Sequence, residues 1–282
     1  MKKHLLSIIT INLNNKTGLE RTIQSVTGQT YSDFEYILID GASTDGSVDI
    51  IKKYAEKITY WVSEKDNGIY NAMNKGILKA NGEYCLFINS GDVFIKTTIL
   101  DEMLIYINGE DILYGNGFFE AKSNTLDKLE CPVKLTLSFF TIYCLLHPCT
   151  LIKKSLFDKY GLYNESNKIV SDGEFFIKAI ILNNVKTKLI PLEIAIAEDN
   201  GVSRNIEYKT ILEDEREKLF SNFFPGYVLD FMSDYKDLKL ENMKLAYENN
   251  KLFSEISTYK RNILFRAILK IMRLLTRVFH TL

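Results

Sequence analysis

The chain has 282 residues, and its 35 basic and 36 acidic side chains leave a net charge of −1. Hydrophobic residues make up 46% of the chain and charged residues 25%, values typical of a globular protein with a sizeable core. This length fits one large domain, or one domain with an extension. The near-neutral charge argues against nucleic acid as a partner, because nucleic-acid binding needs a strongly basic face.

The cysteines and the first residues indicate a cytoplasmic protein. Four cysteines form no paired framework, so we expect reduced thiols. The start, MKKHLLSIITINLNN, resembles a signal peptide, but its apolar run ends at Asn12 without a cleavage site. We therefore predict that this run is the first strand. No segment contains the roughly 20 apolar residues that a membrane-spanning helix needs.

Strand-like and helical patterns alternate along the first half of the chain. The expected strands are residues 5–13, 34–40, 58–64 and 84–89, and the expected helices are residues 18–29, 46–57 and 70–80. Such alternation, with almost continuously apolar strands, predicts an α/β fold with a mainly parallel central sheet flanked by helices. Ligands of these sheets bind at the carboxyl ends of the strands.

The second half is sparser in motifs. We expect strands at residues 110–116 and 186–198, and a helix at residues 171–182 that Ser171 or Asp172 would cap. After about residue 205 the sequence is typical of helix without strands. We therefore predict two domains, residues 1–205 and a helical extension of residues 206–282.

The first polar turn is LIDGASTDGS, residues 38–47, in which Asp40 ends a strand. An acid in that place can accept hydrogen bonds from a nucleoside base or ribose, and Ser43 and Asp45 follow it in the turn. The alternative is an ordinary loop with a helix cap, which the same residue types favour.

The second polar segment is SEKDNGIYNAMNKG, residues 63–76, which joins a strand to a helix. Asp66 belongs to it, and Asn74 and Lys75 are candidates to face phosphates, with Lys75 as a point charge. The alternative is a solvated helix face.

The third segment, LFINSGDVF, residues 86–94, sets Asp92 after a buried strand. A lone carboxylate there can hold Mg²⁺ or Mn²⁺ when substrate phosphates and water supply the other oxygens. The alternative is a type I or II turn, which favours these residues.

Together with SIITINLNN, residues 7–15, these segments closely resemble the family 2 glycosyltransferases, which have the GT-A fold. The closest resemblance is to bacterial members that build capsule, lipopolysaccharide and exopolysaccharide. It implies that Asp40 contacts the base of a nucleotide-sugar donor and that Thr10 and Asn14 belong to the nucleotide-binding first strand. Asn89 stands where the family usually has the leading acid of its metal motif, so Asp92 alone would be the anionic metal ligand. The predicted donor-binding residues are Thr10, Asn14, Asp40, Ser43, Asp45, Asp66, Asn74 and Lys75.

The resemblance also implies a catalytic base. Asp172 in KIVSDGEFFIKA resembles the later acid of the family, which takes a proton from the acceptor hydroxyl in a single, inverting displacement. The alternative is that Asp172 only caps its helix. His147, in a segment that also resembles the family, is a candidate for the acceptor pocket or the metal. The spacing of Cys144, His147 and Cys149 fits no usual zinc site.

The last residues, 259–282, combine a basic and an apolar stripe. At 100° per residue, Arg266, Lys270, Arg273 and Arg277 fall on one side, and apolar residues such as Leu264, Ile268 and Ile271 lie opposite. This pattern predicts a helix lying on an anionic membrane surface, which places the protein at the inner face of the cell membrane. The alternative is packing on the protein itself or on a partner.

Between residues 235 and 263, two rows of residues repeat at intervals of seven. Leu238, Leu245 and Leu252 form one row, and Asn242 and Asn249 begin the other. Asparagine in such a row can specify a two-stranded coiled coil, which would make the protein a homodimer.

The sequence thus predicts a hexosyltransferase that moves a sugar from a nucleotide-sugar donor, a UDP-sugar in our interpretation, to a glycan acceptor that is lipid-linked. The alternative, motivated by Asn89, is a non-catalytic nucleotide-sugar-binding or scaffold protein of a polysaccharide assembly complex.

Overall fold

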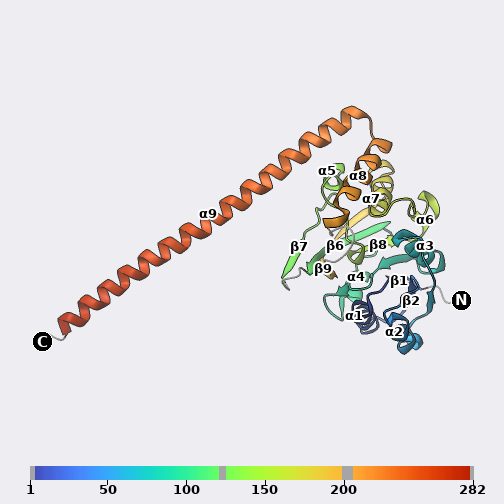
Figure 1. Ribbon diagram of the computed structural model, residues 1–282, viewed down its shortest axis with the longest axis horizontal. Helices are drawn as coiled ribbons and strands as arrows, with labels where there is room; N and C mark the ends of the chain where they lie inside the picture. Colours follow the sequence, from blue (N-terminus) through green and yellow to red (C-terminus); the bar gives the residue numbers. More distant parts are fainter. Residues whose placement is uncertain (1–3, 121–124, 199–205, 280–282) are drawn as a thin grey trace. The chain divides into compact units, whose positions relative to one another are not determined.

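The structure is a computed structural model that describes residues 4–120, 125–198 and 206–279, with the backbone alone for residue 206 and residues 259–279. The chain divides into two compact units, residues 1–225 and residues 226–282 (Figure 1). The first unit therefore contains the helix that follows residue 205. The predicted domain boundary near residue 205 stays a prediction.

Four parallel strands form one half of the sheet, in the order β3-β2-β1-β4. Their core residues, such as Ile8, Ile9, Ile37 and Leu38, have no exposed surface, and each such side chain stabilises the fold by about 2 kcal/mol. Burial on both faces explains why β1, β2 and β4 are almost continuously apolar, whereas β3, at the edge of the sheet, is half-buried. The four predicted strands are confirmed. They are β1 (Leu6–Asn12), β2 (Phe34–Asp40), β3 (Tyr60–Ser63) and β4 (Tyr84–Phe87).

Antiparallel pairs join the other strands to this half. β8 runs antiparallel to both β4 and β6, whereas β6 and β9 are parallel to each other. The two later strands are confirmed, and the sequence missed β5, β7 and β8, each of four residues or fewer. The strands are β5 (Val93–Phe94), β6 (Ile112–Glu120), β7 (Leu126–Leu129), β8 (Thr150–Lys153) and β9 (Thr187–Glu198).

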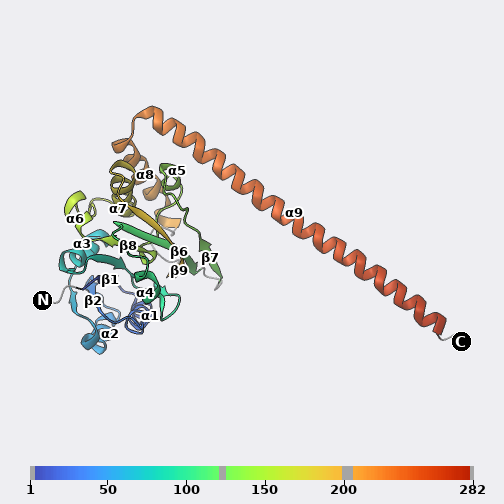
Figure 2. The same cartoon turned by 180° about the vertical axis from the view of Figure 1, so that it is seen from behind.

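The predicted helices after β1, β2 and β3 are confirmed. α3 packs on β1 and β2, and α1 packs on α2 and β5. Helices α5, α7 and α8 gather at one end of the unit in both views (Figures 1 and 2). The helices are α1 (Lys16–Thr27), α2 (Ser47–Lys53), α3 (Ile69–Lys79), α4 (Ile99–Leu104), α5 (Leu137–Phe140), α6 (Ser155–Tyr160), α7 (Ser171–Phe176) and α8 (Lys209–Phe223), with 3-10 turns at Ala55–Lys57, His147–Cys149 and Ile206–Tyr208.

The helix predicted at residues 171–182 is present, because α7 continues as a π-helix, Ile177–Leu182. The prediction that Ser171 or Asp172 caps this helix is wrong. Val170 occupies the N-cap position, and no side chain caps the helix there. The Ser171 hydroxyl instead donates to the carbonyl oxygen of Asn164 at 2.6 Å, and Asp172 lies inside the first turn.

The second unit is one helix, α9 (Gly226–Phe279). Pro225 separates it from α8, as expected of a residue that disfavours helix before it. The described residues after 205 contain helices and no strand, as predicted. None of the described helices has a stretch long and apolar enough to cross a membrane. The predicted membrane-facing stripe of residues 259–282 lies outside the described side chains.

Candidate active site

The carboxyl ends of β1 to β4 lie at one edge of the sheet because these strands run parallel. The register pairs Asn12 at the end of β1 with Asp40 at the end of β2, and Asp40 with Ser63 at the end of β3. The polar segments that follow these strands therefore begin at the same edge, where open sheets of this kind bind ligands.

Asp40 is completely buried, and other polar groups of the edge hold its carboxylate. Oδ1 accepts hydrogen bonds from Asn12 Nδ2 at 2.7 Å and from the Ser43 hydroxyl at 2.6 Å. Oδ2 accepts from the Ser63 hydroxyl at 2.6 Å and from the Ser43 N–H at 3.0 Å. A nucleoside that displaced one of these hydroxyls would meet a carboxylate that is already fixed in place.

Thr10 and Asn14 lie at different depths. Thr10 is completely buried, and its hydroxyl donates to the carbonyl oxygen of Ile88 at 2.6 Å, which joins β1 to the end of β4. Asn14 is exposed, with φ of +50°, and its Oδ1 accepts from the N–H of Thr44 at 2.8 Å. Thr10 therefore links β1 to the residue after β4 beneath the strand ends. Asn14 fixes the exposed turn that contains Thr44.

Asp45 joins the starts of two helices. Its carboxylate accepts hydrogen bonds from the N–H of Lys16 at 2.8 Å and from the N–H and hydroxyl of Ser47 at 3.0 and 2.6 Å. Although desolvation acts in the opposite direction, these bonds hold the pKa of Asp45 below its ordinary value. Asp45 thus orders the turn that begins with Asp40.

Asp66 and Lys75 form an ion pair beside the Asp40 turn. Lys75 Nζ lies 2.6 Å from Asp66 Oδ1 and 2.7 Å from Glu64 Oε1. A Cβ atom at Gly41 would lie 3.2 Å from Asp66 Oδ2, so Asp66 is directly beside the Asp40 turn. Desolvation opposes the shift, but the two carboxylates raise the pKa of Lys75. A phosphate would therefore compete with two acids for this ammonium group.

Asn74 has a different environment from the one that the sequence suggests. It is buried, and its Nδ2 donates to the carbonyl oxygen of Tyr163 at 2.9 Å and to Glu165 Oε1 at 2.8 Å. Its Oδ1 accepts from the Tyr163 N–H at 3.0 Å. The amide joins α3 to residues 163–165 and keeps no free donor for a phosphate.

Asp92 is buried in the turn that follows β4. Its Oδ2 accepts from the Asn89 N–H at 3.1 Å, and its Oδ1 accepts from the Glu198 N–H, at the end of β9, at 3.0 Å. Burial raises the pKa of Asp92 to about 7, against the effect of these two hydrogen bonds. Gly91 has φ of +102°, and a Cβ atom there would overlap the Glu198 carboxylate, so the turn requires glycine.

The residues around this turn fit a hard divalent cation. The buried Oδ1 atom of Asn89 has no hydrogen-bond partner, and the carboxylates of Asp92 and Glu198 lie nearby. All of these ligands are oxygen atoms, which Mg²⁺ and Mn²⁺ prefer. The described residues contain no group of three His, Cys, Asp or Glu side chains that would hold a metal. A cation here would therefore need oxygen atoms from a bound ligand.

Asp172 lies in the first turn of α7, and its side chain is 20% exposed. The Tyr70 hydroxyl lies 3.1 Å from its Oδ1 and also bonds the carbonyl oxygen of Ile169. Its Oδ2 lies 3.7 Å from Cys144 Sγ and 3.8 Å from His147 Nδ1. Tyr70 belongs to α3, so the segment after β3 reaches both the Asp40 turn and Asp172.

His147 lies between Asp172 and the end of β4. Its ring packs edge-on against Phe87, the last residue of β4, with centroids 5.1 Å apart, and its Nε2 lies 3.0 Å from the Tyr163 hydroxyl. Burial lowers the pKa of His147, against the opposing charge of Asp172. The neutral imidazole therefore lies between Asp172 and Phe87 and connects α7 to the end of β4.

The structure therefore brings most of the predicted residues to one region. Asp40, Ser43 and Asp66 lie beside one another, and Asp92 lies in the turn after β4. Asp172 lies beside His147, and the His147 ring packs against Phe87, the last residue of β4. Thr10 lies beneath this region, where it bonds the carbonyl group that follows β4, and Asn74 bonds residues 163–165 instead of facing a ligand.

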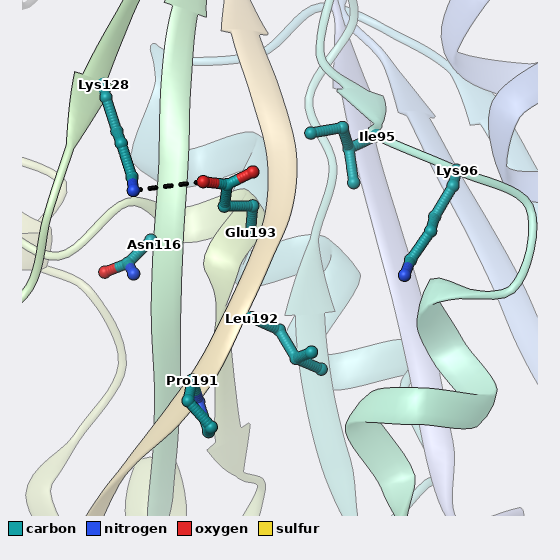
Figure 3. A pocket seen from close by; sticks show the side chains of 7 residues that line it. All are labelled: Ile95, Lys96, Asn116, Lys128, Pro191, Leu192 and Glu193. Carbon is teal, nitrogen blue, oxygen red and sulfur yellow. Dashed lines mark ion pairs between the residues drawn. The ribbon is translucent and has the colours of Figure 1, made fainter.

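A separate pocket of about 410 Å³ lies between β6, β7, β9 and the residues that follow β5 (Figure 3). Lys128 of β7 and Glu193 of β9 form an ion pair of 3.1 Å at its margin. None of the residues predicted for donor binding, metal binding or catalysis lines it. Its lining residues are Ile95, Lys96, Asn116, Lys128, Pro191, Leu192 and Glu193.

The sequence analysis missed two polar residues of this region, Glu198 and Tyr70. Glu198 ends β9 beside Asp92, and its Oε2 accepts from Asn15 Nδ2 at 3.0 Å. Tyr70 bonds the segment of Asp172. Glu198 ends an apolar strand, as Asp40 does, so the same sequence pattern could have identified it as a candidate site residue. Nothing in the sequence distinguished Tyr70 from other aromatic core residues.

Comparison with known proteins identifies relatives of this chain. The family model described as Glycosyl transferase family 2 matches residues 7–161, more than half of the chain. An uncharacterized glycosyltransferase of Mycobacterium tuberculosis is 32% identical over 183 residues, covering 63% of this chain and 69% of the relative. A PGL/p-HBAD biosynthesis glycosyltransferase of Mycobacterium bovis is 27% identical over 226 residues, covering 76% of this chain and 84% of the relative.

Solved structures share the fold at low sequence identity. TarS 1-349 of S. aureus, in complex with UDP-GlcNAc, has a TM-score of 0.59 and 19% identity, over 70% of this chain and 59% of that one. The longer TarS structure is matched over 36% of its own length, so this chain spans about a third of it. The mannosyltransferase PcManGT of Pyrobaculum calidifontis, in complex with GDP-Man and Mn²⁺, has a TM-score of 0.56 and 14% identity, over 76% of this chain and 69% of that one. The predicted GT-A fold is confirmed.

We expect the buried carboxyl of Asp92 to make stability depend on pH. Its pKa of about 7 in the folded protein lies above the ordinary value of 3.8, so the folded state binds the proton more tightly. This contribution to stability is present at low pH and is lost as pH rises from about 4 to about 7. The melting temperature of the wild type, relative to that of Asp92→Asn, should therefore fall over this range in EDTA. Asp49→Asn, at an exposed position, is the control. A wild-type and an Asp92→Asn protein with parallel pH profiles would contradict the expectation.

Proposed function

We propose, given that the chain belongs to glycosyl transferase family 2, that it is an inverting, metal-assisted hexosyltransferase with a UDP-sugar donor. Family membership and the names of the relatives make the chain a glycosyltransferase, as the sequence predicted. The observation that carries the proposal is that the Asp40 turn and the Asp92 turn follow two strands that flank β1 in parallel, and that Asp172 is linked through His147 to the end of the second of these strands, β4.

In this proposal the nucleoside of the donor binds at the Asp40 turn. The fixed carboxylate accepts hydrogen bonds from the base or ribose, and Ser43, Asp45 and Asp66 hold the surrounding backbone and charge. UDP-GlcNAc in the TarS complex and GDP-Man in the PcManGT complex support a nucleotide sugar as the donor class. Of these two nucleotides, we propose UDP for the donor of this chain.

Asn89 Oδ1 and Asp92 are the ligands that we propose for Mg²⁺ or Mn²⁺, with Glu198 beside them. Bound there with the donor, the cation would supply positive charge that stabilises the departing diphosphate. The unpartnered amide oxygen of Asn89 supports this assignment, because it is a neutral replacement for the acid of the usual metal motif that still offers an oxygen ligand.

Asp172 is the proposed catalytic base. Its carboxylate takes the proton of the acceptor hydroxyl while that oxygen bonds to the anomeric carbon, and the bond from this carbon to the diphosphate breaks. A single displacement inverts the anomeric centre. Partial exposure and the hydrogen bond from Tyr70 support this role, since the base must be reachable and held in one orientation.

The proposed acceptor is a lipid-linked glycan at the inner face of the cell membrane, in the synthesis of capsule, lipopolysaccharide or exopolysaccharide. The basic and apolar stripes of residues 259–282 support membrane binding, because a helix of this kind lies in the interface of an anionic bilayer. We also propose a homodimer formed through residues 235–263. Leu238, Leu245 and Leu252 of α9 are each at least 50% exposed, which supports a partner helix on that side.

Asp172→Asn should lower turnover by at least 100-fold and leave donor affinity within twofold, because a general base contributes about 10²- to 10⁴-fold. UDP release from UDP-GlcNAc with Mn²⁺ measures turnover, and titration calorimetry with UDP-GlcNAc measures affinity. Asp158→Asn, at an exposed position, is the matched control. Turnover of Asp172→Asn equal to that of the wild type would remove the assignment. Absence of UDP release from every UDP-sugar tried, and of GDP release from every GDP-sugar tried, by the wild type would favour the non-catalytic alternative.

The full-length protein should sediment with vesicles that contain phosphatidylglycerol and not with neutral phosphatidylcholine vesicles. Replacement of Arg266, Lys270, Arg273 and Arg277 by Ser should weaken binding to anionic vesicles at least tenfold, since each basic group contributes about 1 kcal/mol. Equal binding of the variant and the wild type would contradict membrane attachment through this stripe.

The intact protein should sediment as a dimer, and Leu245→Asp should shift it to a monomer because a buried carboxylate would separate the helices. Lys244→Asp changes the neighbouring exposed residue outside the two rows and is the control. A wild-type monomer in sedimentation velocity would end the dimer proposal.

A further inference from the structure

The segment that carries Asp172 is held between two helices. On the side of α3, the Tyr70 hydroxyl bonds the carbonyl oxygen of Ile169 and lies 3.1 Å from Asp172 Oδ1. On the other side lies α8, which comes after the sequence that matches the family and after the predicted domain boundary. The same short segment, residues 168–172, therefore contacts a helix near the Asp40 turn and a helix from the end of the first unit.

Glu215 of α8 fixes the backbone of this segment. Its Oε1 accepts a hydrogen bond from the N–H of Lys168 at 2.6 Å, and its Oε2 accepts one from the N–H of Ile169 at 2.9 Å. Hydrogen bonds to a charged acceptor are about twice as strong as neutral ones. With Tyr70 on the Ile169 carbonyl group and Glu215 on its N–H, the peptide groups on both sides of Ile169 are held.

Arg216, the next residue, bonds the backbone of α5. Its guanidinium group donates to the carbonyl oxygen of Phe140 at 2.8 Å. The group is half-buried, and burial lowers its pKa, while the nearby Cys144 and Asp172 act in the opposite direction. A buried cation is costly without an anion close by, and Asp172 is the carboxylate whose charge acts on it.

We propose that Glu215 and Arg216 are positioning residues for Asp172, which makes α8 part of the catalytic unit. The inference rests on the proposed role of Asp172. Glu215 sets the position of the backbone that leads into α7, and Arg216 holds the carbonyl group of Phe140, which precedes Cys144, the residue whose Sγ lies 3.7 Å from Asp172 Oδ2. An error of about 1 Å in the position of a reacting group can cost on the order of 10²-fold in rate, so two contacts outside the reacting region can control turnover.

The first measurement is the turnover and KM of the full-length protein for UDP-GlcNAc with Mn²⁺, read as UDP release. Glu215→Ala and Arg216→Ala should each lower turnover by about 10- to 100-fold and leave the KM within twofold, because donor binding does not involve these residues. Arg216→Lys and Glu215→Gln should recover part of the loss. Glu217→Ala, on the exposed side of α8, is the matched control and should behave as the wild type.

The second measurement is deuterium exchange of the peptide that spans residues 164–176. It should be at least fivefold faster in Glu215→Ala, with unchanged exchange in β1 and β2, if Glu215 holds the Lys168 and Ile169 amides. Exchange needs no turnover, so this arm tests the positioning claim with any donor. Unchanged exchange, wild-type turnover in both Ala variants, or a loss that resides wholly in KM would overturn the inference. An inactive Asp172→Asn with active α8 variants would leave the proposed function standing and remove only this inference.

Discussion

The parallel register of β1, β2, β3 and β4 is the constraint on which the site depends. It sets Asn12, Asp40 and Ser63 side by side at the ends of three strands, so one buried carboxylate can bond to its neighbours on both sides. A buried charge is tolerated only when it is hydrogen-bonded in this way. A shift of one residue in either strand pair would separate these partners. The turns that follow the strands begin at the same edge for the same reason.

The second half of the site reaches this edge through long-range packing. The antiparallel strand β8 joins β4 to β6, and the 3-10 turn before it places His147 against Phe87. α3 then connects the two halves, because Asn74 holds residues 163–165 and Tyr70 holds the segment of Asp172. The Asp40 side and the Asp172 side of the site are thus joined by hydrogen bonds from one helix, which limits the freedom of Asp172 relative to the sheet.

The residues that the sequence could identify are those whose position follows from a local pattern. Asp40 and Asp92 come directly after apolar strands, and the parallel arrangement of those strands follows from their alternation with helices. The pairing of Asp92 with Glu198 was not predictable, because 106 residues separate them and only the sheet brings them together. Asn74 has the residue type of a phosphate ligand, yet tertiary packing uses all of its amide. Glu215 and Arg216 resemble any charged pair on an amphipathic helix until their contacts with Ile169 and Phe140 are known.

The central claim is that Asp40, Asp92 and Asp172 serve one bound donor and its acceptor. A crystal structure of the full-length protein with Mn²⁺ and UDP-GlcNAc tests it most directly. The account predicts uracil or ribose against the Asp40 turn, the diphosphate and Mn²⁺ at Asn89 and Asp92, and the anomeric carbon facing Asp172. Electron density for the donor in the pocket of Figure 3, or a donor at the strand ends whose anomeric carbon faces away from Asp172, would contradict the account.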